Sequence, residues 1–476
     1  MSFTIAEFLF LGFSVFFAIY YLLLRGKKTK KLTEPFLLVT SLAVYSVGAG
    51  WKTGLLLALT CLLTKWAGDL LFHSHSRLRL AVFVTLALCP LFLFKYLNFL
   101  LGTLNTVLHT AFSAGDWAAP LGISFITFSV LSYLIDVYRG EEPGSMLSTG
   151  LYVLFFPKIL SGPIVRWKEF RQKWALRCVS VDLTEQGARR LMMGFIKKAV
   201  LADSFGVAAT MIGSSVPNGV DAPSIVLMGF CMMFQIYFDF SGYSDIALGL
   251  SNMLGVSWKE NFHFPYLSTS VSDFWRRWHI SLGSWFREYV YIPLGGNRRG
   301  NVYVNLFIVF ALTGIWHGAR WNMVLWGCLN GLAVMAERKI ARHKRSTMKN
   351  TRCGTVIRWL FTMVFVYFSW MLFMAPNLGQ ALQYGRILLF SPYASTALNF
   401  TWQYFLTPRL LVLLSIAGVG SVLPAIVPTG IKEKLLQFRK TVPGYWIESA
   451  LLFALLVLAA LFMINASYSP FLYFQY

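Results

Sequence analysis

The sequence predicts an all-α protein, a polytopic bundle of about ten to twelve membrane elements, some of them broken or re-entrant. Two observations indicate this fold class. Of the 476 residues, 57% are hydrophobic and only 13% are charged. Apolar runs that reach or approach the ~20 residues needed to cross a bilayer follow one another along the chain. Because no repeat period or separate soluble segment is visible, we expect a single membrane domain over residues 1–476.

The charge pattern indicates how the bundle is oriented. The chain has 42 Lys and Arg residues against 20 Asp and Glu residues, a net charge of +22. Basic residues of polytopic proteins collect in cytoplasmic loops, so this charge is expected to report topology, and no nucleic-acid partner is expected. The basic clusters at residues 25–31, 338–352 and 432–440 are therefore predicted to be cytoplasmic. The C-terminal tail, residues 466–476, is then expected on the extracytoplasmic side.

The expected membrane elements follow the apolar runs in chain order. The first extends from Phe3 to Leu24, and because its positive cluster follows it, we expect a retained span and not a cleaved signal. Short or Gly/Pro-interrupted elements are expected to be buried in protein or to line a cavity. The other elements are expected near residues 36–48, 51–72, 79–102, 117–138, 147–164, 190–213, 223–255, 301–317, 321–337, 355–375, 406–428 and 446–465.

The first group of polar residues lies inside the run at 223–255. On a helix, Gln235, Asp239 and Tyr243 share one face. A carboxylate at membrane depth must be paired, protonated or in contact with water. For Asp245 the pattern favours a structural pair with an arginine from another element. For Asp239 a structural role and a substrate-binding role both remain open.

The second group lies in residues 266–300, which the pattern predicts to be an interfacial or re-entrant amphipathic helix. Asp273 can pair with Arg277 at a spacing of i, i+4. On periodicity alone, the pattern favours an aromatic anchor with arginines reaching toward the interface over a functional site. His279 favours a site, because a second histidine, His317, follows in apolar surroundings. The large side chains at helical spacing are Phe274, Trp278, Leu282, Trp285 and Tyr289.

The third group is an imidazole at the end of the apolar run 307–317. A titratable side chain in hydrocarbon is costly, and histidine suits proton transfer near neutral pH, so His317 is a candidate catalytic residue. Flanking glycines break the helix, and Trp316 and Trp321 are candidates for the walls of a pocket. A lone histidine that only donates a hydrogen bond between helices remains the alternative.

Other kinds of site have no support in the sequence. The six cysteines show neither CxxC spacing nor a disulfide framework. No cluster of Cys, His and carboxylates has zinc-type spacing, so we expect no metal and no bound cofactor. No phosphate-binding loop, hydrolase elbow or dinucleotide motif occurs in a suitable context.

Four blocks of sequence carry a resemblance to a known family. They are residues 155–164, residues 235–245, residues 272–281 with 291–296, and residues 313–318. In this order they resemble the membrane-bound O-acyltransferase family, above all its bacterial branch that acetylates alginate, peptidoglycan and other cell-envelope polysaccharides. The resemblance implies that His317 is the essential catalytic histidine and that His279 is the second histidine of a central active-site tunnel. One departure is Asn330, where relatives often carry a further histidine.

The resemblance also implies a reaction, the transfer of an acetyl group from acetyl-CoA or a similar cytoplasmic thioester to a hydroxyl. Such a transfer needs a base and stabilisation of the oxyanion, so we expect neutral His317 to be the base. His279 or Asn322 would then hydrogen-bond the thioester carbonyl, and the arginines would steer an anionic donor. The side chains expected to bind substrate are Trp316, Asn322, Arg276, Arg277 and Asp239.

The last residues of the tail suggest an acceptor for the acetyl group. Residues 469–476 resemble short aromatic C-terminal motifs that end in tyrosine and relay acyl groups in related envelope-acylating systems. Tyr476 would carry the acetyl ester to an extracytoplasmic, hydrolase-like acetyltransferase partner. An interfacial aromatic anchor is the alternative for this tail. The resemblance implies a multi-pass protein of the bacterial inner membrane.

Two rival functions follow from the same features. A transporter or flippase of envelope precursors would also be polytopic and basic, but repeated halves with matching broken helices are expected of that class. An acyltransferase acting on a lipid, a protein or teichoic acid is the other alternative.

Overall fold

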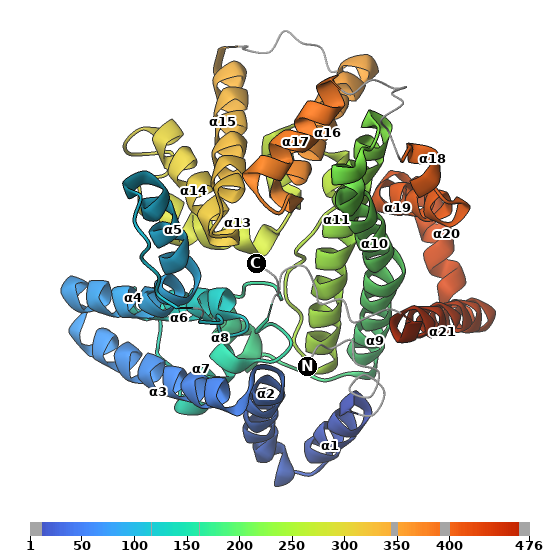
Figure 1. Cartoon of the computed structure of the whole chain (residues 1–476). Helices are drawn as coiled ribbons and strands as arrows, with labels where there is room; N and C mark the ends of the chain where they lie inside the picture. The colour runs from blue at the N-terminus through green and yellow to red at the C-terminus, as the bar shows by residue number, and fades with distance from the viewer. Residues whose placement is uncertain (1–11, 116, 161, 344–350, 391–399, 466–476) are drawn as a thin grey trace. The chain divides into compact units, whose positions relative to one another are not determined.

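The structure is a computed structural model, and every extended element of regular structure among the residues that it describes is a helix (Figure 1). Within the described part of the chain, the one isolated β-bridge joins Val220 and Phe400. The predicted all-α class is therefore confirmed. The expected relay residue, Tyr476, lies outside the described residues, as does the rest of the tail. The structure describes residues 12–115, 117–160, 162–343, 351–390 and 400–465.

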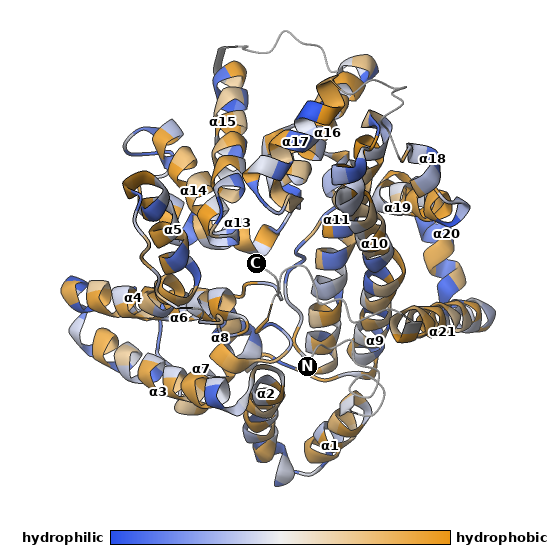
Figure 2. Ribbon diagram, viewed as in Figure 1, coloured by the Kyte–Doolittle hydropathy of each residue, from blue (hydrophilic) through white to orange (hydrophobic). Residues whose placement is uncertain are grey.

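The number of membrane elements also agrees with the prediction. Eight helical stretches of the described chain are long and apolar enough to cross a membrane, and Figure 2 shows hydrophobic residues along much of their length. Three shorter apolar helices accompany them, Phe13–Arg25, Ile123–Tyr138 and Val302–His317. The eight are Thr29–Ala49, Trp51–Ser74, Arg77–Leu108, Val181–Asn218, Ala222–Met253, Arg352–Met374, Pro408–Ile426 and Val442–Ile464.

The described chain forms two compact units. The first contains residues 12–191, 244–259 and 463–465. Helix α6 is buried along most of its length and packs against α3, α4, α7 and α8. The helices of this unit are α1 (Phe13–Arg25), α2 (Thr33–Ala49), α3 (Trp51–Ser74), α4 (Arg77–Leu91), α5 (Leu97–Leu108), α6 (Ile123–Tyr138), α7 (Met146–Leu154), α8 (Trp167–Ala175) and the first part of α9 (Val181–Ile196).

The element expected at residues 147–164 is interrupted, as its Pro157, Gly162 and Pro163 predict. Its helix, α7, ends at Leu154, and irregular turns follow. Proline disfavours the helical conformation of the residue before it, so Pro157 prevents the helix from continuing through Phe156. The Tyr152 hydroxyl donates to the Val165 carbonyl (3.0 Å) and holds the irregular segment against α7.

The second unit contains residues 192–243 and 260–462 and carries both candidate histidines. Its longest helix, α11, is the most buried of the candidate spans. The helices of this unit are the end of α9, α10 (Asp203–Ser215), α11 (Ala222–Met253) as far as residue 243, α12 (Val271–Arg277), α13 (Ile280–Phe286), α14 (Val302–His317), α15 (Trp321–His343), α16 (Arg352–Met374), α17 (Leu378–Phe390), α18 (Trp402–Phe405), α19 (Pro408–Ile426), α20 (Thr429–Lys440) and α21 (Val442–Asn465) as far as residue 462.

Candidate active site

The hairpin of α14 and α15 positions His317 (Figure 1). Helix α14 ends at this histidine because the next residue, Gly318, is extended and begins the turn. The two helices approach backbone to backbone at Gly314 and Gly327. A Cβ on Gly327 would lie 2.5 Å from the Phe310 carbonyl oxygen, so only glycine permits this approach. The close contact fixes the end of α14, and with it the imidazole, against α15.

Aromatic rings enclose the His317 imidazole, which is 4% exposed. The ring centroids of Trp316, Trp326 and Phe373 lie 4.6, 5.2 and 5.1 Å from its own. All three contacts are edge-to-face, which is a favourable geometry for aromatic groups. These walls hold the ring in one orientation and exclude bulk water from it.

The segment around His279 is broken where the sequence predicted one amphipathic helix. It forms α12, α13 and a π-helical turn, Arg287–Tyr291. The break is at His279, which has a left-handed backbone (φ 46°, ψ 53°) that costs free energy in a residue other than glycine. The expected pair of Asp273 and Arg277 is present at 2.9 Å. The large side chains expected at helical spacing, Phe274, Trp278, Leu282, Trp285 and Tyr289, are all buried.

A neighbouring loop holds the break in place. The Ile280 amide donates to the Asn261 carbonyl, and the His263 amide donates to the Arg277 carbonyl, both at 2.9 Å. The Asn261 side-chain oxygen also lies 3.2 Å from Nδ1 of His279. Both of these side chains are 1% exposed. Burial lowers the pKa of His279 well below its ordinary value, so its imidazole is neutral at physiological pH.

Trp316 brings the two candidate histidines together. Its ring centroid lies 6.3 Å from that of His279 and 4.6 Å from that of His317. On its other side, the His279 ring meets Phe240 edge-to-face at 4.5 Å. Both imidazoles therefore contact the same indole ring.

Helix α15 also positions α12, the helix that precedes His279. The Glu337 carboxylate accepts from the Ser272 amide (2.8 Å) and hydroxyl (2.7 Å) at the start of α12. The Asn330 side-chain oxygen accepts from the Trp275 indole at 3.2 Å, and its amide donates to the Ser369 hydroxyl at 3.0 Å. Asn330, the departure noted in the sequence, thus joins α12, α15 and α16.

A cavity of about 320 Å³ opens beside His279. One face of α14 lines it through Leu306, Phe310 and Thr313, and the same helical face continues one turn further to His317. The remaining wall combines aromatic, aliphatic and polar side chains. The lining residues are Trp275, Trp278, His279, Leu282, Gly283, Phe286, Arg287, Tyr291, Asn297, Leu306, Val309, Phe310, Thr313 and Arg338.

Two arginines of this lining were not expected to be part of the site. Arg287 is exposed, and Arg338 is half-buried and donates to the Asn297 side-chain oxygen at 3.0 Å. Tyr291 donates to the same oxygen at 2.7 Å. Arg287 follows His279 by two helical turns, a spacing that could have placed it near the histidine. Arg338 was interpreted only as a topology signal, because its contact with the cavity depends on how α15 packs.

The two arginines expected to bind substrate, Arg276 and Arg277, are not among the described lining residues of this cavity. The Arg276 side chain is 72% exposed and lies 3.2 Å from the Asp273 carboxylate. Arg277 pairs with the same carboxylate.

Asn322, also expected to bind substrate, is fully buried, and its amide donates to the carbonyls of Leu372 (3.1 Å) and Ala375 (2.9 Å). These hydrogen bonds join α15 to the end of α16 and engage both amide protons.

The two carboxylates singled out in the run 223–255, Asp239 and Asp245, are both in ion pairs. Asp245 pairs with Arg190 at 2.9 Å, so the structural pair predicted for it is confirmed. Asp239 lies 2.8 Å from the Lys198 ammonium, which also contacts Asp203 at 2.7 Å. Lys198 belongs to a π-helical turn, Lys197–Ala202. Asp239 is absent from the described lining of the cavity.

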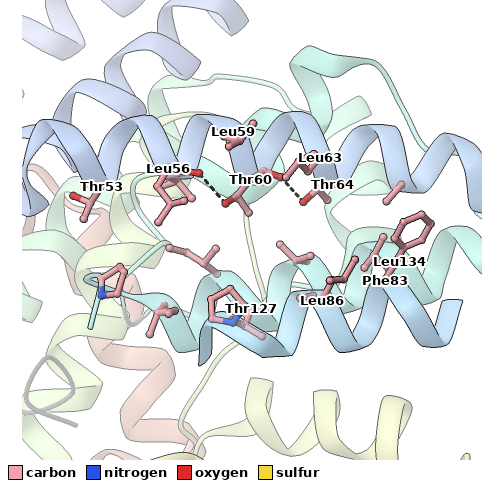
Figure 3. A pocket seen from close by; sticks show the side chains of 18 of the residues that line it. Thr53, Leu56, Leu59, Thr60, Leu63, Thr64, Phe83, Leu86, Thr127 and Leu134 are labelled. Carbon is pink, nitrogen blue, oxygen red and sulfur yellow. Dashed lines mark hydrogen bonds between the residues drawn. The ribbon is translucent and has the colours of Figure 1, made fainter. Parts of the chain in front are cut away.

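A second cavity, of about 300 Å³, lies in the first unit and is lined mainly by α3, α4 and α6 (Figure 3). Its described lining is largely aliphatic and aromatic. The Thr60 and Thr64 hydroxyls donate to carbonyls of their own helix, at 2.8 and 2.6 Å. The hydroxyl of Tyr45, in α2, donates to the Leu121 carbonyl, which lies outside that helix. We call this cavity the apolar groove and the cavity beside His279 the histidine cavity.

The fold and the site together define a class of protein. Two buried histidines in an all-α membrane protein, beside a cavity with arginines in its wall, are typical of an enzyme that moves protons in a water-poor site. Comparison of sequences gives the family. The sequence model of MBOAT, the membrane-bound O-acyltransferase family, matches residues 2–378. The chain belongs to this family and is an O-acyltransferase of a bacterial membrane family.

Named relatives show which branch the chain resembles. The probable alginate O-acetylase of Pseudomonas putida is 35% identical, with 100% of both chains covered. The peptidoglycan O-acetyltransferase of Helicobacter pylori is 32% identical over 65% of this chain and 64% of its own. The teichoic acid D-alanyltransferase of Streptococcus thermophilus is 31% identical over 49% of this chain and 60% of its own.

Proposed function

We propose that this enzyme takes an acetyl group from a cytoplasmic thioester and passes it across the bacterial cytoplasmic membrane for O-acetylation of a cell-envelope polysaccharide. The names of its relatives support an acceptor of the alginate or peptidoglycan type. The observation that carries the proposal is the histidine cavity, whose wall joins two arginines to His279 and to the helical face that ends at His317. As an O-acyltransferase, the chain does not belong to the transporter class considered from its sequence.

The histidine cavity fits a long donor with an anionic head. Arg287 and Arg338 present guanidinium groups, which bind phosphate well, while the aromatic walls suit an uncharged arm. Arg338 begins the basic cluster that the positive-inside rule assigns to the cytoplasm. Acetyl-CoA has this combination of phosphates, a thin arm and a terminal thioester, and we propose it as the donor.

His317 is the proposed base. Its neutral imidazole accepts the proton of the acceptor hydroxyl as the oxygen bonds to the thioester carbonyl carbon. When the carbon–sulfur bond breaks, the thiolate takes the proton from the imidazolium and leaves as a thiol. The products are an acetyl ester and a free thiol, and the imidazole is neutral again.

The first acceptor we propose is Tyr476, from whose ester an extracytoplasmic, hydrolase-like partner would move the acetyl group to the polymer. A tyrosyl oxygen can carry an acyl group, which divides a long transfer into shorter steps. The support is the aromatic sequence of the tail, Phe-Leu-Tyr-Phe-Gln-Tyr, at the expected extracytoplasmic end of the chain.

Turnover in vesicles tests the proposed reaction. The full-length protein, reconstituted with acetyl-CoA labelled in the acetyl group, is expected to release thiol and to form an acetyl ester. His317→Ala should abolish both while membrane insertion remains unchanged. Full turnover of His317→Ala would exclude this histidine as the base. Transfer from D-alanyl thioesters with none from acetyl thioesters would assign the chain to the teichoic acid reaction.

Mass spectrometry of the C-terminal peptide tests the relay. We expect acetyl on Tyr476 after incubation with the donor, and none in Tyr476→Phe. Tyr473→Phe is the matched control, because it removes a tyrosine from the same tail and should keep the modification. Unchanged polymer acetylation by Tyr476→Phe would rule out the relay and favour an interfacial anchor.

A further inference from the structure

The side-chain oxygen of Asn261 is an acceptor for the segment that carries His279. It accepts from the Ser281 amide at 3.2 Å and from the Ser281 hydroxyl at 2.9 Å. Nδ1 of His279 lies 3.2 Å from the same oxygen. Asn261 and His279 are each 1% exposed, so the contact between their side chains is buried.

The Ser281 amide settles which end of the Asn261 side chain faces the histidine. A backbone N–H can only donate, so the atom that it meets must be the carbonyl oxygen and not the NH₂ group of the side chain. A carbonyl oxygen can only accept a hydrogen bond. Nδ1 of His279 therefore has to carry a hydrogen in order to bond to it.

We propose that Asn261 is a positioning residue that holds His279 as its Nδ1–H tautomer, so that Nε2 meets the reactants as a hydrogen-bond acceptor. Two backbone hydrogen bonds between the same loops, from Ile280 to Asn261 and from His263 to Arg277, fix the distance between the two side chains. They also hold the left-handed backbone of His279, which turns the ring toward Asn261.

The placement of the ring supports this assignment. His279 lines the histidine cavity, whereas Asn261 is not among its described lining residues. The Nδ1 edge of the imidazole thus faces the loop, and the opposite edge, with Nε2, faces away from it. A neutral ring with its hydrogen on Nδ1 has only a lone pair to offer at Nε2.

This tautomer changes the role of His279 in the proposed reaction. The role considered from the sequence, donation of a hydrogen bond to the thioester carbonyl, needs a hydrogen on Nε2. With Asn261 in place, His279 can instead accept a hydrogen bond, and the stabilisation of the oxyanion must come from other groups. The inference relies on the proposed function for its catalytic meaning, but the tautomer itself can be measured without turnover.

Nitrogen NMR of the full-length protein in lipid, with ¹⁵N-labelled histidine side chains, tests the tautomer. Protonated and unprotonated ring nitrogens have well-separated shifts, and the spectrum of His279→Gln identifies the signals that belong to His279. We expect a protonated Nδ1 and an unprotonated Nε2. A protonated Nε2 with an unprotonated Nδ1 in the wild-type protein would overturn the inference, whatever the effect of the Asn261 variants on folding.

Kinetics of acetyl transfer provide the second test. Asn261→Ala removes the acceptor and is expected to lower kcat roughly tenfold to a hundredfold, with the KM for the donor nearly unchanged. Asn261→Asp keeps an acceptor oxygen and should recover most of kcat and the Nδ1–H signal. Ser281→Ala is the matched control, because it removes another partner of the same oxygen and should change kcat by less than about threefold.

The outcomes separate positioning from general loss of structure. A spectrum of Asn261→Ala in which His279 shows a mixture of tautomers, together with the fall in kcat, supports the inference. The wild-type tautomer in Asn261→Ala overturns it, and so does a change of tautomer in Ser281→Ala instead. If the wild-type protein shows no acetyl transfer, the proposed function fails while the NMR result still decides the tautomer.

Discussion

The apolar groove and the histidine cavity have nearly the same volume, about 300 and 320 Å³, yet only the second is suited to catalysis. In the groove, the hydroxyls of Thr60 and Thr64 donate to carbonyls of their own helix. In the histidine cavity, a neutral imidazole and two guanidinium groups line the wall. The imidazole and guanidinium groups in the lining therefore identify the catalytic site, whereas the volume of the cavity does not.

The strongest test of this comparison is to fill each cavity. Thr313 and Thr64 are buried, and each donates to a carbonyl four residues earlier, at 2.8 and 2.6 Å. Thr313→Trp should block the histidine cavity and lower kcat/KM for the donor by about a hundredfold or more, since a misplaced substrate costs that much. Thr64→Trp should fill the groove and leave kcat/KM within about twofold of wild type.

Steady-state acetyl transfer and thermal stability in the same detergent check this pair of variants. Similar losses of stability with different losses of activity would support the assignment of the reaction to the histidine cavity. Equal losses of activity would remove the distinction between the two cavities.

The arginines of the histidine cavity provide a second test of this difference. Replacing Arg287 and Arg338 together with glutamine should raise the KM for acetyl-CoA about tenfold, because each lost phosphate contact weakens binding of the anionic donor. A short acetyl thioester without phosphates should keep its KM. Arg276→Gln is the control, since this arginine is exposed and pairs with Asp273. A larger KM effect in Arg276→Gln would return the donor site to the position expected from the sequence.

Much of the fold and part of the site could be predicted from the sequence, for physical reasons that differ from one element to another. The hydrophobic runs predict where the membrane-spanning helices lie, because the bilayer requires long apolar helices. Asp245 and Arg190 pair as expected, since a carboxylate at membrane depth needs a partner. The periodic aromatic residues around His279 are buried, but the break at His279 was missed, because a left-handed residue stabilised by another loop leaves no periodic signal.

The parts of the site that escaped prediction depend on packing between distant segments. Asn261 precedes His279 by 18 positions and meets it only because two loops pair through their backbones. Arg338 reaches the histidine cavity because Gly314 and Gly327 let α15 pack closely on α14. A single sequence reveals neither the pairing of the two loops nor the close packing of α15 on α14. Each contact depends on the shapes of the two segments and not on the period of a helix.

The glycine contact of α14 and α15 predicts a smaller effect. A Cβ on Gly327 would meet the Phe310 carbonyl, so Gly327→Ala should separate the helices and displace His317. We expect a loss of about 1–3 kcal/mol in stability, typical of overpacking, and a fall in kcat. Gly102→Ala in α5 is the matched control, because nothing lies within 4 Å of its added methyl group. Equal stability of the two variants, measured by thermal unfolding, would contradict the close packing.

The pH dependence of stability is the smallest expected difference. Burial lowers the pKa of His279 in the folded state, while the unfolded chain keeps an ordinary value near 6.5. Below that pH the unfolded state takes up a proton that the folded state cannot, so this contribution is fully present above about pH 6.5 and is lost as the pH falls. Between pH 7 and pH 5.5 the loss from this one group amounts to about 1 kcal/mol.

His279→Gln isolates this contribution, because every other titrating group is shared with the wild type. Thermal unfolding of the two proteins between pH 7 and pH 5.5 should show a weaker pH dependence in the variant. Thr64→Val, in the apolar groove, should keep the wild-type dependence, since it removes a hydroxyl that is bonded within its own helix. Parallel curves for wild type and His279→Gln would mean that the imidazole gains a proton in the folded state as easily as in the unfolded one. The histidine cavity would then be open to water, and its difference from the apolar groove would lie in charge alone.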